Sequence, residues 1–142
     1  MQSLHSFVLR FHSPSTGLLL IRLALGIAFL YHGWDKFTSL DQTVAFFGSI
    51  GLGAFWAYLV AFLETFGGIA LILGLVTRYA AVLLAAEMAV AILKVHLSNG
   101  FSLANVGYEY AFVLLLCSIA LFASGAGSYS VDARMMARKQ MM

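Results

Sequence analysis

The sequence predicts an all-α, polytopic membrane protein: a bundle of four transmembrane helices with a short interfacial helix between spans 1 and 2. Of its 142 residues, 62% are hydrophobic and only 10% are charged, whereas soluble domains have about 25% charged residues. Apolar stretches recur along the chain at about the 20 residues that a bilayer core of about 30 Å requires. We therefore expect one membrane domain over residues 1–142 and no second domain.

The four spans are predicted at about residues 17–37, 55–75, 79–97 and 107–123. The first span contains Arg22, and no clear cleavage site follows it, so we expect no cleavable signal peptide. At about 100° per residue, one face of this span carries charged and small residues and should point into the bundle. The residues of that face are Arg22, Gly26, Phe29, Gly33 and Lys36.

The connections carry helix and turn signals of their own. Met1–Ser13 reads as an amphipathic surface element ended by Pro14, or alternatively as a disordered tail. Within Thr38–Ala54, the capping-box spacing of Ser39 and Gln42 predicts a short interfacial helix. We expect glycines to break that helix, at Gly48, Gly51 and Gly53. After span 4, Ser130 or Asp132 could cap a short cationic helix.

Cations outside the spans indicate the orientation. With four crossings they all fall on one side: Arg10, Arg78, Arg134, Arg138 and Lys139. The positive-inside rule makes that side cytoplasmic, so both termini should be cytoplasmic. An aromatic belt then gathers at the outer interface, formed by Tyr31, Trp34, Trp56, Tyr58, Tyr108 and Tyr110.

Two acids lie deep in adjoining spans. Counted at 1.5 Å per residue from the Arg78 end, Glu87 lies about 13 Å deep and Glu64 about 18–20 Å deep. Arg22 enters from the same side and should reach toward them, so we expect an Arg22–Glu87/Glu64 network. Intramembrane carboxylates are functional by default, although a purely structural ion pair remains the alternative. Two carboxylates this close cannot both ionise cheaply, so one is expected to hold a proton.

A second polar group is predicted near the outer end of the spans. It comprises His32, Asp35, Lys36, Lys94, His96 and Glu109. Glu87 and Lys94 share a helix face, while His96 should point elsewhere. This group could form the floor of an outward-facing pocket rimmed by Tyr31, Trp34, Tyr108 and Tyr110. Alternatively, these charges simply snorkel to the headgroups, and the histidines are packed or interfacial residues.

Several chemistries find no support in the composition. Cys117 is the only cysteine, so the chain cannot form an internal disulfide or a CxxC pair. The net charge of +2 provides no basic face for nucleic acid. No His/Cys/Asp spacing supports a metal site, although a haem or metal held by His32 and His96 stays open.

Ordered motifs over about Leu20 to Asp132 resemble the DoxX family. They are HGWDK (32–36), ETFGGIALILGLVTRYAA (64–81), KVH (94–96), GYE (107–109) and GAGSYSVD (125–132). The resemblance implies a four-helix protein of the bacterial or archaeal plasma (inner) membrane, with relatives linked to quinone or thiosulfate:quinone oxidoreduction. It also implies a shared site at His32, Lys36, Glu64, Arg78, Lys94, His96 and Glu109.

Three functions remain open, and the chain's status as an enzyme is uncertain. The first is a quinone-linked redox subunit, with a quinone as candidate ligand and an oxidoreductase partner supplying electrons. In it, Glu64, Glu87, His32 and Glu109 would exchange protons, and the ligand would be bound by Arg22, Lys36, Arg78, Lys94, His96, Tyr31, Trp34 and Tyr108. The second is a proton or small-solute carrier, which would need to form a homo-oligomer. The third is a non-catalytic assembly or stabilising subunit.

Overall fold

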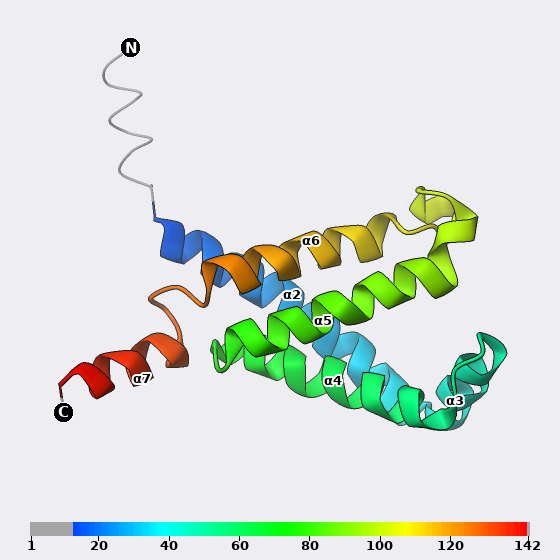
Figure 1. Cartoon of the computed structure of the whole chain (residues 1–142), viewed down its shortest axis with the longest axis horizontal. Coiled ribbons are helices and arrows are strands. Elements are labelled where there is room, and N and C mark those ends of the chain that lie inside the picture. The colour runs from blue at the N-terminus through cyan, green and yellow to red at the C-terminus, as the bar shows by residue number, and fades with distance from the viewer. Residues whose placement is uncertain (1–12, 142) are drawn as a thin grey trace, which may run out of the picture.

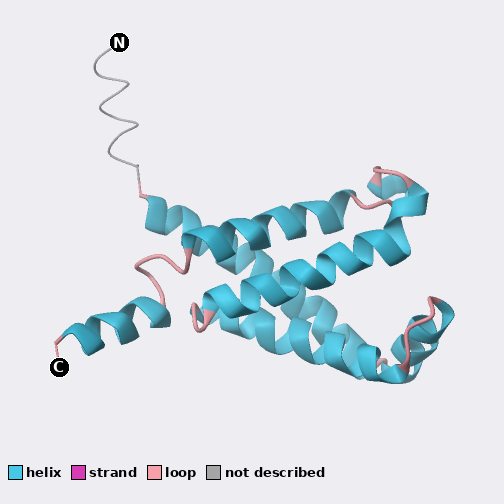
Figure 2. Ribbon diagram, in the orientation of Figure 1, coloured by secondary structure: helices cyan, strands magenta, loops and turns pink. Residues whose placement is uncertain are grey.

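A computed structural model describes residues 13–141, and every regular element in that range is a helix (Figure 2). The surface element predicted for Met1–Ser13 lies outside the described residues except for Ser13. The first described helix, α2, spans Pro14–Thr38. Ser13 caps it by accepting a hydrogen bond from the Thr16 backbone N–H at 3.3 Å. Pro14 therefore begins this helix, because proline suits a first turn whose N–H groups need no helical acceptor.

The interfacial helix is present as α3, Leu40–Ser49. Its predicted cap is wrong, because the Ser39 side chain makes no capping hydrogen bond. Instead, the Thr43 hydroxyl donates to the Ser39 carbonyl at 3.0 Å. Gly48 also lies within the helix, so it does not break it. The chain turns after the helix, where Gly51 has a φ of +77°.

A tight hairpin joins α4, Ala54–Leu73, to α5, Thr77–Ala91. Gly74 ends α4 in the left-handed conformation with φ +67°, which glycine adopts without steric cost. The apolar stretch continues beyond α5 as a π-helical turn, η1 (Ile92–His96), and a 3₁₀ turn, η2 (Leu97–Asn99). The third predicted span is therefore present but is not a uniform α-helix.

The remaining elements are a 3₁₀ turn, η3 (Leu103–Asn105), and two helices, α6 (Glu109–Ser124) and α7 (Val131–Gln140). Ser130 caps α7 by accepting from the Ala133 backbone N–H at 3.1 Å. The predicted C-terminal helix is thus present, and Ser130 rather than Asp132 is its cap.

The bundle consists of two helix pairs, with α2 packed along α4 and α5 packed along α6 (Figure 1). Gly26 and Gly68 let the first pair approach closely, since a Cβ at Gly68 would lie 2.6 Å from the Leu30 backbone nitrogen. Between the pairs lies an apolar core that includes Leu25, Phe29, Leu71, Leu84 and Leu121. The predicted inward face of the first span is confirmed at Arg22, Gly26, Phe29 and Gly33, all of which are buried.

Three helical segments are long and apolar enough to cross a membrane: Pro14–Thr38, Ala54–Leu73 and Thr77–Asn99. The fourth apolar helix, Glu109–Ser124, has 16 residues, which span about 24 Å. Large apolar side chains are exposed along all four helices, as on a helical bundle whose outer surface faces lipid. The fold class is therefore confirmed as all-helical and membrane-type, with three helical segments of membrane-crossing length and a shorter fourth apolar helix.

Candidate functional site

Lys36 of α2 and Glu64 of α4 form an ion pair in the described chain, with 2.5 Å between Nζ and Oε2. The Glu64 side chain is only 5% exposed and that of Lys36 is 25% exposed. Gly33 makes the pair possible, because a Cβ there would collide with the backbone of Glu64 and Thr65. The close approach of the helices at Gly33 brings Lys36, one turn later, beside the carboxylate.

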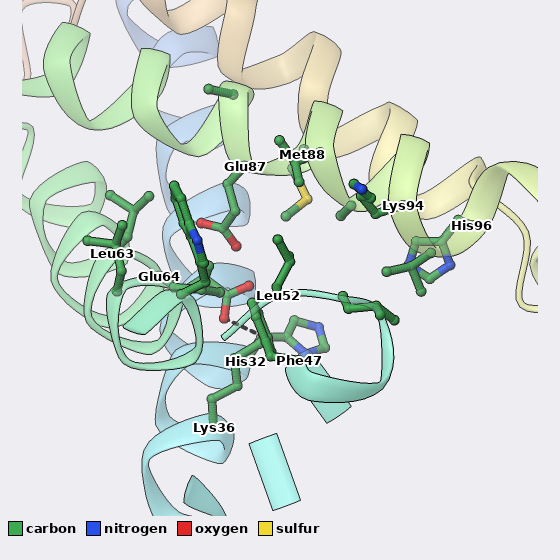
Figure 3. Close-up of a pocket in the computed structure, with 18 of the residues that line it drawn as sticks. His32, Lys36, Phe47, Leu52, Leu63, Glu64, Glu87, Met88, Lys94 and His96 are labelled. Atoms are coloured by element: carbon green, nitrogen blue, oxygen red, sulfur yellow. Dashed lines mark hydrogen bonds and ion pairs between the residues drawn. The ribbon is translucent and has the colours of Figure 1, made fainter. Parts of the chain in front are cut away.

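Glu87 lies near this ion pair and comes from α5, a helix of the other helix pair. Its carboxyl group is directed toward that of Glu64 (Figure 3), and both side chains line the same cavity. Among the residues that the structure describes, Oε2 of Glu87 is buried and has no hydrogen-bond partner. The structure therefore brings the two predicted acids together, and Oε2 of Glu87 remains free to form a hydrogen bond with a ligand.

Lys36, Glu64 and Glu87 line a cavity of about 580 Å³ between α2, α3, α4, α5 and α6. Its volume lies within the range of about 300–1,000 Å³ that is usual for small-molecule sites. The titratable residues that line it are His32, Lys36, Glu64, Glu87, Lys94, His96 and Tyr110. Its other walls are apolar or aromatic and include Phe46, Phe47, Leu52, Trp56, Leu59 and Met88. Ionisable groups thus share an otherwise apolar space, as Figure 3 shows.

His96 lines the cavity together with Lys94, so the prediction that it points elsewhere is wrong. On a regular helix the two side chains would diverge by about 200°. Both residues belong to the π-helical turn η1, which changes the angle between successive side chains. His96 Nδ1 also lies 2.8 Å from the Val106 carbonyl oxygen, which fixes the ring against the following loop.

Arg22 does not contact the two acids, and the predicted network is wrong on this point. Its guanidinium donates to carbonyl oxygens, at 3.0 Å to Leu71, 2.6 Å to Ala126 and 2.9 Å to Tyr129. These acceptors belong to the end of α4 and to the segment after α6. Arg22 therefore fastens that end of the bundle, and Lys36 supplies the cation of the buried cluster.

Arg78 and Asp132 also lie at this end, away from the cavity. Arg78 Nη1 donates to the Phe122 carbonyl at 2.8 Å near the end of α6. The two carboxylate oxygens of Asp132 accept from the backbone N–H groups of Val76 (2.8 Å) and Thr77 (2.9 Å). Cations at helix carboxyl ends and an anion at a helix amino end both match the helix dipoles. The structure thus does not bring Arg78 to the predicted acid site.

The remaining predicted residues lie outside the cavity lining. Glu109 Oε2 accepts from the Leu103 backbone N–H at 2.9 Å and so holds the loop before α6. Tyr31 and Trp34 are 70% and 63% exposed, and Tyr108 packs edge-on against Phe101. None of the three aromatic residues lines the cavity, and the proposed roles of all these residues in binding or catalysis stay predictions.

Other aromatic residues line the cavity instead, and no specific signal in the sequence predicts that they do. The sequence predicts Trp56 and Tyr110 in the aromatic belt, but both line the cavity. The Tyr110 ring meets that of His32 at a centroid distance of 6.0 Å. Phe46 and Phe47 come from α3, and only the packing of that short helix against α4 places them here.

Comparisons with known proteins agree with this architecture. The DoxX family model matches residues 17–97. Putative oxidoreductase CatD of Bacillus subtilis is 41% identical over 116 residues, covering 82% of this chain and 84% of that protein. Inner membrane protein YqjF of Escherichia coli is 27% identical over 116 residues, covering 82% and 89%. No solved structure matches. The matched segment contains the Lys36–Glu64 pair, Glu87, and Lys94 and His96 of the π-helical turn, and the chain belongs to the DoxX family.

Proposed function

We propose that the cavity binds a lipophilic redox carrier of the quinone class and that Glu64 and Glu87 exchange protons with it. The observation that supports this most directly is the meeting of Lys36, Glu64 and Glu87 inside an otherwise apolar cavity. A bilayer protein draws such ligands from the lipid, where only apolar molecules are concentrated. Buried acid and base groups within reach of a ligand oxygen are what proton transfer needs.

The lining fits the two parts of such a ligand. Aromatic and aliphatic walls, including Trp56, Phe47 and Leu59, suit a ring and its apolar tail. Lys36 and His32 can donate to a ligand oxygen, and the unpartnered Glu87 Oε2 can hold or accept a proton. Reduction of a quinone to a hydroquinone consumes two electrons and two protons, and this chain's residues would handle the protons.

Electrons require a further component in this proposal. The single cysteine, Cys117, cannot form the dithiol pair that would carry two electrons within the chain. We therefore assign electron supply to an oxidoreductase partner in the same membrane. The name of the Bacillus subtilis relative, Putative oxidoreductase CatD, is compatible with such a redox role.

We also propose four membrane crossings in the plasma (inner) membrane of a bacterium or archaeon, with both termini cytoplasmic. Asp132 hydrogen-bonds to Val76 and Thr77, so the chain after α6 returns to the end where α5 begins. A cytoplasmic position of that end is supported by three exposed cations on α7, Arg134, Arg138 and Lys139.

The two tryptophans of the chain provide the binding test. Trp56 lines the cavity, and Trp34 is exposed outside it. In lipid nanodiscs, a short-chain quinone should quench a Trp34→Phe variant, which retains Trp56, saturably and at low ligand-to-lipid ratio. A Trp56→Phe variant, which retains Trp34, should show only the linear quenching expected of a quinone dissolved in lipid.

Substitutions at the acids then test the chemistry. In the Trp34→Phe background, Glu64→Gln and Glu87→Gln should each raise the quinone Kd obtained from the saturable quenching by about tenfold. This change corresponds to the loss of roughly one charge-assisted hydrogen bond. Glu109→Gln is the matched control, since Glu109 holds a loop outside the cavity. Equal linear quenching of both tryptophans, or equal effects of all three substitutions, would contradict the proposal and favour a stabilising subunit.

A further inference from the structure

A second cavity, of about 600 Å³, lies at the opposite end of the bundle from η1 and the loops around it. It is bounded by α7, by the start of α5 and by the segment between α6 and α7, at the end that Figure 1 shows on the left. Its lining is more polar than that of the first cavity, with hydroxyl groups from Ser15, Ser124 and Ser128. Nothing in the proposed quinone chemistry uses this space.

Two cations line this cavity, Arg78 from α5 and Lys139 from α7. Within the described residues, Arg78 donates only Nη1 to a protein acceptor, the Phe122 carbonyl. The rest of its guanidinium carries further N–H donors for a ligand. Lys139 is exposed on the last turn of α7 and makes no ion pair with a described residue.

The one acid in the lining, Asp132, is already engaged. Both of its oxygens accept backbone N–H groups at the start of α5. The nearby Arg22 donates hydrogen bonds to four backbone carbonyl oxygens. The cavity therefore contains two cations whose N–H groups are free to donate and one carboxylate whose oxygens already accept hydrogen bonds. Such a lining suits an anionic ligand.

The surroundings indicate what kind of anion would lie here. The cavity sits where the apolar helices end, which is the depth of lipid headgroups. Apolar side chains at its edge, Val76, Tyr79, Met135 and Met136, are between 50% and 74% exposed. Basic pockets between helices on the cytoplasmic side are typical binding sites for phospholipid headgroups.

We propose that this cavity binds the phosphate headgroup of an anionic phospholipid, held by Arg78 and Lys139. The acyl chains would extend along the exposed apolar side chains at the start of α5. Such a lipid would tie α7 to the α5–α6 end of the bundle, because its phosphate contacts one cation from each part. The proposal does not depend on the ligand of the first cavity.

Native mass spectrometry of the full chain tests the proposal. Protein released from nanodiscs that contain equal amounts of phosphatidylglycerol and phosphatidylcholine should retain phosphatidylglycerol preferentially. Lys139→Gln should reduce the retained phosphatidylglycerol about fivefold, the effect of about one surface cation on an anionic lipid. Arg78→Gln should reduce it at least as much, while Arg78→Lys should keep most of it.

The control is Arg138→Gln, which removes the same charge from the neighbouring residue of α7 but does not line the cavity. It should retain phosphatidylglycerol like the unaltered chain. Equal losses from Arg138→Gln and Lys139→Gln would overturn the proposal in favour of diffuse attraction to the helix. Release of the lipid by millimolar inorganic phosphate would overturn it in favour of a site for soluble anions, and so would the absence of any preference for phosphatidylglycerol.

If Arg78→Gln fails to fold because it uncaps α6, Lys139→Gln decides the outcome alone, since Lys139 is exposed and caps nothing in the described chain.

Discussion

At the scale of single residues, Lys36 supplies the opposite charge that pairs with Glu64 inside the bundle. Glu64 is 5% exposed and its ion pair in the described chain is with Lys36. Removing one partner of a buried pair costs about 3–5 kcal/mol, and the 25% exposure of Lys36 places Lys36→Met nearer to about 2–3 kcal/mol. Thermal unfolding in detergent, followed by intrinsic fluorescence, should show this loss.

The matched control is Lys94→Met, which removes the same charge from the same cavity. Lys94 is exposed and has no ion-pair partner among the described residues, so its loss should change the stability by less than about 0.5 kcal/mol. Adding Glu64→Gln to Lys36→Met should recover most of the stability, because no uncompensated charge then remains. Similar losses from both lysine variants would mean that the ion pair contributes little.

The sequence correctly predicts which residues lie at the same depth along the helices, but it does not predict which groups a long side chain contacts. Counting helix rise from the hairpin placed Glu64 and Glu87 at similar depth, and they share one cavity. The same counting suggested Arg22 as their cation. It could not show that the segment after α6 folds back and presents the Ala126 and Tyr129 carbonyls to Arg22. That contact depends on a loop conformation that no periodicity encodes.

At the scale of elements, the contact between α2 and α4 depends on glycines where the backbones nearly touch. A Cβ at Gly68 would lie 2.6 Å from the Leu30 nitrogen and 2.7 Å from the Gly26 carbonyl oxygen. Both obstacles are backbone atoms, so relief requires the helices to separate. We expect Gly68→Ala to destabilise the protein by about 2–3 kcal/mol, as overpacking of a tight interface does. Thermal unfolding measures it.

Gly48→Ala is the control for that substitution. Gly48 also lies inside a helix, but a Cβ there meets nothing within 4 Å. Alanine in a helix is favoured over glycine by about 0.5–1 kcal/mol, so this variant should be as stable as the original chain or slightly more stable. If Gly68→Ala also proves neutral, the two helices are not held at the separation that the structure shows.

Helix positions were predictable to within a few residues because the apolar stretches are long. At the start of α2, for example, the predicted span begins at about residue 17, whereas the helix begins at Pro14. The π-helical turn at Ile92–His96 was not predictable. Its sequence, ILKVH, contains no proline or glycine that would indicate a break in the helix. The irregularity arises where the chain must reach the loop that holds His96 against Val106.

At the scale of the whole molecule, the two ends of the bundle differ in character. One end is fastened by Arg22, Arg78 and Asp132, all hydrogen-bonded to backbone groups of other segments. Toward the other end, the pairs α2–α4 and α5–α6 diverge (Figure 1), and the cavity with the two acids lies between them. A bundle fastened at one end can admit a ligand at the other without losing its fold.

The same fastening supports the proposal of four crossings. The hydrogen bonds of Asp132 to Val76 and Thr77 require α6 to return to the end where α5 begins, although its 16 residues are short for a span.

In a Cys117→Ser background, a membrane-impermeant maleimide on intact cells should label Ser98→Cys and Ser49→Cys. It should label Gln140→Cys only after the membrane is permeabilised. All three positions are exposed, so accessibility within the protein does not limit the reaction. Labelling of Gln140→Cys together with Ser98→Cys on intact cells would mean that α6 does not cross. Labelling of Gln140→Cys alone would keep four crossings and reverse the orientation, because the two ends would then have exchanged sides.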